Sequence, residues 1–437
     1  MLPRLSGLTA PLREIDRPIL ILATISFISQ VGVSIMLPLL PIYAIQLGAS
    51  PRELGLMVSI FAVTVTVGQL GSGFLSEHMT ARRMLPLGQA AYAAANFLIA
   101  TAGSAVALIA YRSLAGFGGG LSIIAERLYL ARVADRARLA FTNGVLSAAG
   151  SAGSVLGPVF GGLLALVDLR IPFIVVGITA TAAAISAALF LPAEARAIPA
   201  GQVPSALDPG EPDLPVADLA LPAAHLVAGP LGSETTAASR SGAHAQALAM
   251  WPLIALGLWN LCFNAAYGGW ITTFGPYAKD ELGLPLNQVT LIFAMFGLGA
   301  IFIGPWLSRV ADRRGQRGMV AFGSMLVLLN LIAMIIHAPV LVVFGSAIAG
   351  GGGLAAAQSS WFALLTVATD GGRSGRSFGL VTALSNLGVV AGALLASEIW
   401  QQVGIDQALV VAAGFMVLAT VSLLLVRARP TAAPEAL

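Results

Sequence analysis

Two charged side chains inside an apolar stretch are the residues of this chain best placed to do chemistry. Arg112 lies well inside residues 106–131, and Glu126 lies near the end of the same stretch. A charge in such a stretch costs free energy unless it faces a cavity or a partner, so both residues are candidates for handling substrate or protons inside the protein. Arg112 favours an anion, and Glu126 favours a cation.

The spacing of these two residues separates their roles. Glu126 lies 14 residues after Arg112, which is about 21 Å along a helix and too far for a direct ion pair. A carboxylate held away from water takes up a proton more readily, so Glu126 is a candidate for proton loading. Arg127 beside it leaves a second interpretation open, in which Glu126 stays charged at the helix end.

Polar side chains that share one helical face inside other apolar stretches are further candidates for substrate contact. They are Ser26, Gln30 and Ser34; Asn260, Asn264 and Tyr267; and Gln358 with Trp361. Amides inside a membrane hold helices together about as often as they contact ligands, so both interpretations stay open. Trp259 and Trp270 are interpreted as packing or membrane-interface residues.

Several kinds of chemistry are excluded by what the sequence lacks. Cys262 is the single cysteine, so disulfides and cysteine-based metal sites are absent. Lys279 is the single lysine and follows Ala278, so no phosphate-binding loop exists and the chain is not its own ATP-driven pump. The sequence therefore predicts neither an enzyme nor a metal or cofactor protein, and the energy must come from an ion gradient.

The elements that position these residues are long apolar helices. The chain is 57% hydrophobic and 10% charged, against about 25% charged residues in a soluble domain. An all-α integral membrane protein with twelve transmembrane helices fits the length, because a span needs about 20 residues. The predicted helices are 18–44, 54–76, 84–103, 106–131, 140–166, 171–192, 249–275, 287–308, 318–337, 340–367, 376–401 and 406–426.

The loops orient these helices. Sixteen basic residues fall in alternate loops and at the two ends of the chain, whereas the opposite loops hold only Arg52, Arg170 and Lys279. Basic residues stay on the cytoplasmic side, so both termini are predicted to be cytoplasmic, in a multi-pass protein of the cell membrane. Residues 193–248 are rich in proline and acids and are interpreted as a flexible cytoplasmic linker, although a regulatory segment is an alternative.

An internal duplication divides the chain into a bundle at 1–192 and a bundle at 249–437. A constant shift of 235 residues places Pro41 on Pro276, Arg82 on Arg317 and Gly157 on Gly392. Because the same shift aligns the loops as well as the helix ends of the two halves, the sequence predicts two pseudo-symmetric six-helix bundles. This arrangement favours alternating access around a site between the halves.

Two matching charged loops carry a resemblance to a known family. One reads Ser308-Arg309-Val310-Ala311-Asp312-Arg313-Arg314-Gly315-Gln316-Arg317, and the other runs from Gly73 through Glu77 to Arg82 and Arg83. They resemble the Gly-x-Leu-x-Asp-Arg-x-Gly-Arg-Arg loop of the major facilitator superfamily, and the first copy departs from it at Glu77, His78, Thr80 and Ala81.

The resemblance implies a gate at these loops. In that family they form a cytoplasmic latch, which would couple Glu77, Arg82 and Arg83 to Asp135, and Asp312, Arg313 and Arg317 to Asp370. Acid and arginine at helix ends can pair in one state and separate in the other. The alternative is that these charges only orient the helices.

A stripe of small residues marks the fifth predicted span. Gly153, Gly157 and Gly161 recur every four residues, and Pro158 and Gly162 complete the string Gly-x-x-x-Gly-Pro-x-x-Gly-Gly. Such a face lets another helix approach closely, and the proline can hinge the span. The string resembles the motif of the superfamily's proton-coupled exporters, and Arg112 matches the arginine of the family's fourth-helix motif.

The resemblance implies a secondary transporter. The expected function is proton-coupled efflux of a small amphipathic compound or drug by a monomer in the lipid bilayer, without a cofactor and without nucleic acid. Uptake of a small metabolite by symport or facilitated diffusion is an alternative in the same fold. A membrane receptor or scaffold that transports nothing is the third.

Overall fold

The computed structural model describes residues 17–133, 139–192, 243–369 and 374–423 of the chain, and within them the regular secondary structure is helical. Six helices form the first half. They are α1 (Arg17–Gln46), α2 (Pro51–Leu75), α3 (Ala81–Ala100), α4 (Ala105–Val133), α5 (Leu139–Ala165) and α6 (Ile171–Phe190). Each corresponds to one predicted span.

The second half contains seven α-helices and a π-helical turn. They are α7 (Ala243–Pro276), η5 (Tyr277–Glu281), α8 (Leu286–Phe302), α9 (Gly304–Arg314), α10 (Gln316–Ile335), α11 (Val340–Thr369), α12 (Ser374–Gln402) and α13 (Ile405–Ser422). The eighth predicted span is bent by 44° between α8 and α9. Pro305 in the first turn of α9 cannot donate to the preceding helix, which accounts for the break. With the bent pair counted as one span, the described helices supply the twelve that were predicted.

The outer surface of these helices suits a lipid environment. Within the described residues, eight helices are individually long and apolar enough to cross a bilayer, and the bent pair makes a ninth. Large apolar side chains such as Val167 and Leu341 are 78% and 83% exposed. Exposed apolar side chains of this size face lipid tails without cost, whereas in water they would favour aggregation.

The duplication is visible in how the helices pack. Gly153 of α5 lies against α1, where a Cβ would be 2.7 Å from the carbonyl oxygen of Phe27. Gly388 of α12 lies against α7 in the same way, with Asn264 Cβ at 3.0 Å. Glycine lets the two backbones meet, so α5 on α1 and α12 on α7 are equivalent pairs in the two bundles.

A tyrosine near the end of the first helix repeats in both bundles. The hydroxyl of Tyr43 donates to the carbonyls of Ala100 and Ala102 at 3.5 and 3.4 Å. The hydroxyl of Tyr277 donates to the carbonyl of Met334 at 2.8 Å. Tyr43 joins α1 to the end of α3, and Tyr277, in the π-helical turn that continues α7, joins that turn to the end of α10.

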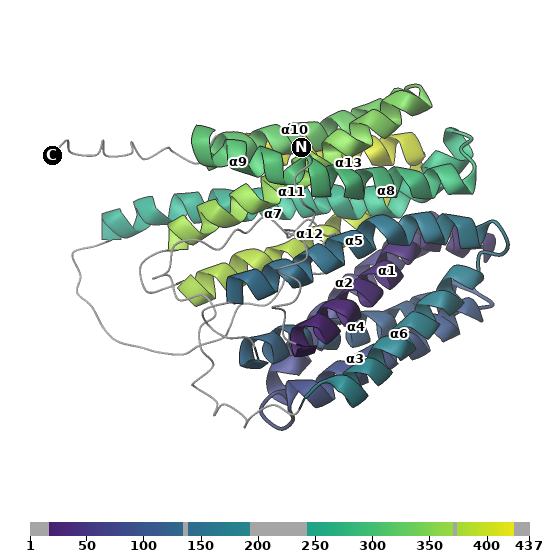
Figure 1. Cartoon of the computed structure of the whole chain (residues 1–437). Coiled ribbons are helices and arrows are strands. Elements are labelled where there is room, and N and C mark those ends of the chain that lie inside the picture. The colour runs from purple at the N-terminus through teal and green to yellow at the C-terminus, as the bar shows by residue number, and fades with distance from the viewer. Residues whose placement is uncertain (1–16, 134–138, 193–242, 370–373, 424–437) are drawn as a thin grey trace, which may run out of the picture.

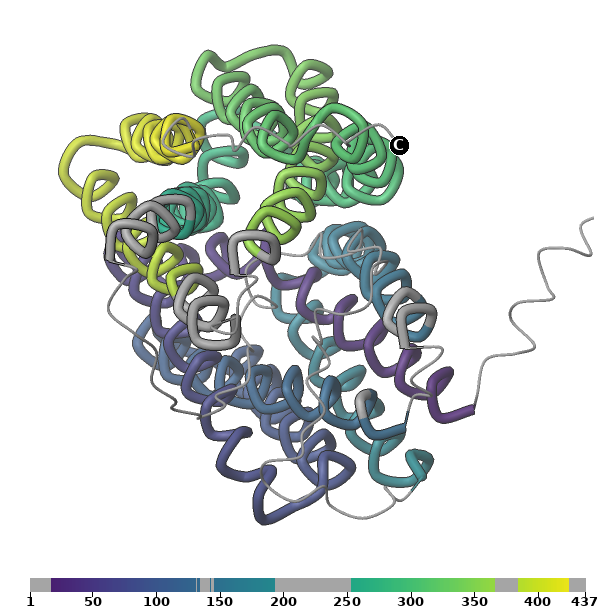
Figure 2. Tube along the Cα trace, turned by 90° about the vertical axis from the view of Figure 1, so that its left-hand side faces the viewer, coloured from purple at the N-terminus to yellow at the C-terminus, as the bar shows by residue number. Residues whose placement is uncertain are grey.

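The two bundles meet mainly along two helix pairs, and α1 and α7 add smaller contacts. Figure 1 shows the second bundle, in green and yellow, above the first, in purple to teal, with α12 and α5 between them. The contacts run from α12 to α2 and from α5 to α8. We call the face where α6 ends and α7 begins the linker face, which Figure 2 views directly, and the other the opposite face. The domain boundaries at 192 and 249 stay a prediction, because residues 193–242 lie outside the described residues.

Candidate functional site

Arg112 is the buried cation of the first bundle. Its residue is 6% exposed, and its guanidinium carbon lies 3.6 Å above the ring of Phe61 on α2. A guanidinium nitrogen lies 3.9 Å from the sulfur of Met36, and the phenols of Tyr92 and Tyr267 are its electrostatic neighbours. Within the described residues no carboxylate lies within ion-pair distance of Arg112. The positive charge is thus held by the Phe61 ring, the Met36 sulfur and the phenol of Tyr92, and no anion of the described residues compensates its desolvation.

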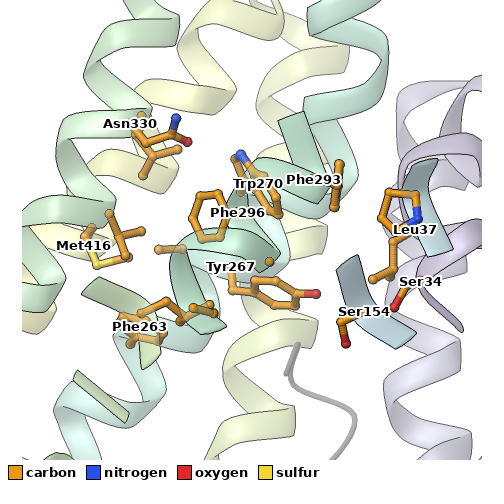
Figure 3. A pocket seen from close by; sticks show the side chains of 17 residues that line it. Ser34, Leu37, Ser154, Phe263, Tyr267, Trp270, Phe293, Phe296, Asn330 and Met416 are labelled. Carbon is orange, nitrogen blue, oxygen red and sulfur yellow. The ribbon is translucent and has the colours of Figure 1, made fainter. Parts of the chain in front are cut away.

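A cavity lies between the bundles and is lined mainly by aromatic and apolar side chains. Ser34 and Leu37 of α1 and Ser154 and Pro158 of α5 form its wall on the first bundle. The second bundle contributes a larger wall that consists of Phe263, Ala266, Tyr267, Trp270, Phe293, Phe296, Gly297, Ala300, Val327, Asn330, Leu331, Leu354 and Met416. In Figure 3 the hydroxyl of Tyr267 is directed across the cavity toward Ser34 and Ser154.

A second cavity is lined by Arg112. Helices α1, α2, α7 and α12 contribute its other walls, including Phe61 and Asn386. Leu37 and Tyr267 line both cavities, so the two are neighbouring lobes of one space between the bundles. We call them the aromatic lobe and the arginine lobe. A largely apolar space with a few polar groups is typical of a small-molecule site.

A face of α1 connects Glu126 with this space. Ser26 donates its hydroxyl hydrogen to the Glu126 carboxylate on α4, a hydrogen bond between two helices near the linker face. One turn further along α1, the amide of Gln30 donates to the hydroxyl of Ser34 at 3.3 Å. Ser34 lines the aromatic lobe. The predicted face of Ser26, Gln30 and Ser34 therefore carries polar groups from Glu126 to the cavity.

Of the predicted asparagines of the second bundle, Asn260 joins two helices and Asn264 contacts Asn260 within the same helix. Asn260 Nδ2 donates to the hydroxyl of Ser385 on α12 at 2.7 Å, and Asn264 Nδ2 donates to the side-chain oxygen of Asn260 at 2.9 Å. Neither amide is among the residues that line the two lobes. Of that predicted set, Tyr267 reaches the cavity, because it lies seven residues further along the same helix.

Gln358 and Trp361 also lie in the interior of the second bundle. The indole nitrogen of Trp361 donates to the carbonyl of Leu256 at 3.0 Å, and its ring stacks on Trp259 with centroids 5.9 Å apart. Gln358 is 6% exposed. Neither Gln358 nor Trp361 is among the residues that line the two lobes.

The small-residue stripe of α5 packs as its spacing predicts. A Cβ at Gly157 would lie 2.7 Å from both Ser34 Cβ and the Val31 carbonyl oxygen, and one at Gly161 would lie 3.1 Å from the Ile35 carbonyl oxygen. Gly162 faces Thr290 of α8 in the other bundle. Pro158, in the same string, lines the aromatic lobe, so the stripe holds α5 against α1 beside the cavity.

The charged loops lie at the linker face. Glu77 and Arg83 are exposed beside the turn between α2 and α3, near Gly73 and Arg82. In the second half Asp312 accepts a hydrogen bond from Gln316 at 2.9 Å, near exposed Arg313 and half-buried Arg317. Gly315 has φ +101°, which glycine adopts without strain, and it separates α9 from α10. Asp135 and Asp370 lie outside the described residues, so their coupling to these loops stays a prediction.

An ion pair between the bundles was missed by the sequence reasoning. The guanidinium of Arg52 on α2 donates two hydrogen bonds to the Glu398 carboxylate on α12, at 2.6 and 2.7 Å. Ser50 and Glu53 form a reciprocal cap at the start of α2, which fixes the turn that carries Arg52. The available signal was a basic residue and an acidic residue at helix ends on the same side, but no repeat or motif links them.

Two further hydrogen bonds join the same helix pair. The Ser59 hydroxyl donates to the carbonyl of Val390 at 3.3 Å, and Asn386 Nδ2 donates to the Thr66 hydroxyl at 2.7 Å. With the ion pair at the helix ends, these bonds run from the opposite face to about the middle of the helices. They close the space between the bundles along α2 and α12 on that side.

Family comparison agrees with this geometry. The sequence model of the Major Facilitator Superfamily matches residues 22–276 and 256–437. The chain belongs to the major facilitator superfamily. It is therefore a multi-pass membrane protein of this family, as the charged loops and the repeat predicted.

Similar curated proteins match only part of the chain. Quinolone resistance protein NorA of Staphylococcus aureus (strain MRSA252) is 27% identical over 151 residues, which are 35% of this chain and 39% of that protein. The MFS-type transporter MJ1560 of Methanocaldococcus jannaschii is 26% identical over 173 residues, 39% of this chain and 45% of that protein. The aligned part thus spans less than half the length of these relatives.

Solved structures share the whole fold. A bacterial homologue of the human lysosomal transporter Spinster superposes with a TM-score of 0.70 at 14% identity, over 93% of this chain and 95% of that chain. Nucleoside transporter NupG superposes with a TM-score of 0.67 at 13% identity, over 94% and 98%. At these identities the likeness establishes the fold alone.

Proposed function

We propose that this transporter is a proton-coupled exporter of small amphipathic compounds that works by alternating access. The observation that carries the proposal is the two-lobed cavity between the bundles, closed toward the opposite face by the α2–α12 contacts. A central site between two repeats is what alternating access requires. The partial likeness to a quinolone resistance protein supports outward movement of a drug-like compound.

The orientation of the proposal follows from the loops. With sixteen basic residues on the linker side and three on the other, we place the linker face in the cytoplasm and the protein in the cell membrane. The Arg52–Glu398 pair then closes the outer side, so that substrate is loaded from the cytoplasmic side. The protein acts as a monomer and needs no bound cofactor, because the proton gradient supplies the energy.

Glu126 supplies the proton step of the proposal. Its carboxylate accepts the hydrogen bond from Ser26 and thereby joins α4 to α1. Protonation removes the negative charge and roughly halves the strength of such a bond. The contact between α1 and α4 then weakens beside the polar face of α1 that leads to the cavity. Protonation of Glu126 is thereby coupled to movement of α1 relative to α4 beside the substrate.

The test is transport by purified protein in proteoliposomes that carry a pH gradient and an internal pH dye. Fluorescent amphipathic compounds, beginning with a quinolone, should move against their concentration gradient while protons move down theirs. Glu126→Gln should abolish the pH dependence, whereas Glu281→Gln, an exposed acid at the opposite face, should leave it unchanged.

Two results would refute parts of the proposal. Substrate flux without proton movement and without sensitivity to an uncoupler would exclude proton coupling. Accumulation of the compound in energised intact cells, rather than its depletion, would indicate uptake instead of export.

A further inference from the structure

The two lobes of the cavity differ sharply in chemistry, and this difference specifies a class of substrate. Among the described residues that line either lobe, Arg112 is the only one that carries a charge. Arg112 lines the arginine lobe together with Asn386 and Tyr267. Glu126 lies elsewhere, about 21 Å away along α4, and its carboxylate is engaged by Ser26.

The aromatic lobe offers a surface of packed aromatic rings. Trp270 is its centre, with ring centroids 4.9 Å from Phe293, 5.6 Å from Phe296 and 6.0 Å from Tyr267. Each of these three rings is tilted against the Trp270 ring by 37–39°, and together the four rings form one wall. A flat aromatic body can pack on such a wall through offset or edge contacts, which contribute beyond the apolar area that they bury.

The arginine lobe lacks an anionic partner for its cation. Arg112 is 6% exposed and has no carboxylate within ion-pair distance among the described residues, so its desolvation is poorly compensated. An anion that entered the lobe would supply that partner through charge-assisted hydrogen bonds. A cation would instead meet repulsion in a space of low dielectric.

We propose that the substrate is an aromatic anion, with a flat ring system on the Trp270 wall and a carboxylate, or a comparable small anionic group, at Arg112. Leu37 and Tyr267 line both lobes, so a ligand that spans the two lobes passes these two side chains. The inference deepens the proposed function by naming its substrate class. It rests on that proposal only in taking this cavity as the transport site.

Equilibrium binding to the purified full-length protein in nanodiscs tests the inference separately from transport. The probes are 2-naphthoate, 2-naphthamide and 2-naphthylmethylammonium, which share one ring system and differ in charge. Naphthoate should bind about tenfold or more tightly than the amide, because a hydrogen bond to a charged group is stronger than a neutral one by about that factor. The ammonium compound should bind most weakly.

Variants assign the preference to its residues. Arg112→Gln should make naphthoate and naphthamide bind equally, and Arg112→Lys should keep a preference for naphthoate. Trp270→Leu should weaken all three probes by a similar factor, since it removes ring contacts and no charge. Arg170→Gln, which removes an exposed arginine outside the cavity, is the matched control and should change nothing.

The outcomes separate the inference from the proposed function. Equal binding of the three probes to the wild-type protein would overturn the inference even if another compound were exported with protons. Arg112-dependent selectivity for naphthoate would support the inference even if proteoliposomes showed no proton coupling. The comparison in wild-type protein needs no variant, so a misfolded Arg112 variant would not prevent a decision.

Discussion

Replacing Gly157 by alanine should loosen the contact between α5 and α1. A Cβ at this position would lie 2.7 Å from Ser34 Cβ and from the Val31 carbonyl oxygen, whereas ordinary contact begins at 3.4 Å. These obstacles are backbone or Cβ atoms that cannot rotate away. The helices must therefore separate by the difference between 3.4 and 2.7 Å, about 0.7 Å.

The size of the effect follows from the cost of overpacking. Inserting a methyl group into a closely packed contact costs about 1–3 kcal/mol. In a protein of this size that cost should lower the midpoint of thermal unfolding by several degrees. Ser34 and Pro158 line the aromatic lobe on either side of this contact, so binding of an aromatic probe should weaken as well.

Gly414 provides the matched control. It lies exposed in the middle of α13, and nothing lies within 4 Å of the position that a Cβ would occupy. Gly414→Ala should therefore leave thermal unfolding unchanged or raise it slightly, because alanine favours a helix over glycine. The measurement is the unfolding midpoint of both purified variants in one detergent. A Gly157→Ala protein as stable as wild type, with unchanged probe binding, would refute the packing argument.

Three further outcomes are expected. Arg52→Glu and Glu398→Arg should each widen the distance between spin labels at the opposite-face ends of α2 and α12, and the double charge reversal should restore it. An unchanged distance in both single variants would exclude the pair as a latch. Tyr277→Phe should lower stability by about 1 kcal/mol, the net contribution of the hydrogen bond to the end of α10, and chemical denaturation would detect it. Asn260→Leu should destabilise by about 0.6 kcal/mol for each of the two side-chain bonds that it removes, to Ser385 and from Asn264. Probe binding should stay intact, and altered probe affinity would instead make Asn260 a ligand contact.

The helices and the close approach of α5 could be predicted because both depend on local patterns. A long apolar run must form a helix in lipid, since every backbone group has to find its partner within the segment. The four-residue spacing of Gly153, Gly157 and Gly161 specifies one small face whichever helix it meets. The break at Ile303 was missed because the apolar run continues through it, although Pro305 was visible.

The candidate site could be predicted only in part. Arg112 stood out because a charge inside a span is rare and costly, and it does line a cavity. Trp270 was interpreted as a packing or interface residue, yet it forms the wall of the aromatic lobe. An aromatic side chain carries no local signal that separates a cavity wall from a packed interior.

By itself the sequence determined a membrane protein of two repeated six-helix bundles. The hydropathy pattern, the basic loops and the constant 235-residue offset between the halves depend only on the order of residues along the chain. Only the tertiary structure decided which residues from different bundles meet. Arg52 and Glu398 are 346 positions apart and pair because α2 packs on α12. Arg112 shares its space with Tyr267 for the same kind of reason, since the cavity exists only where the two bundles are packed together.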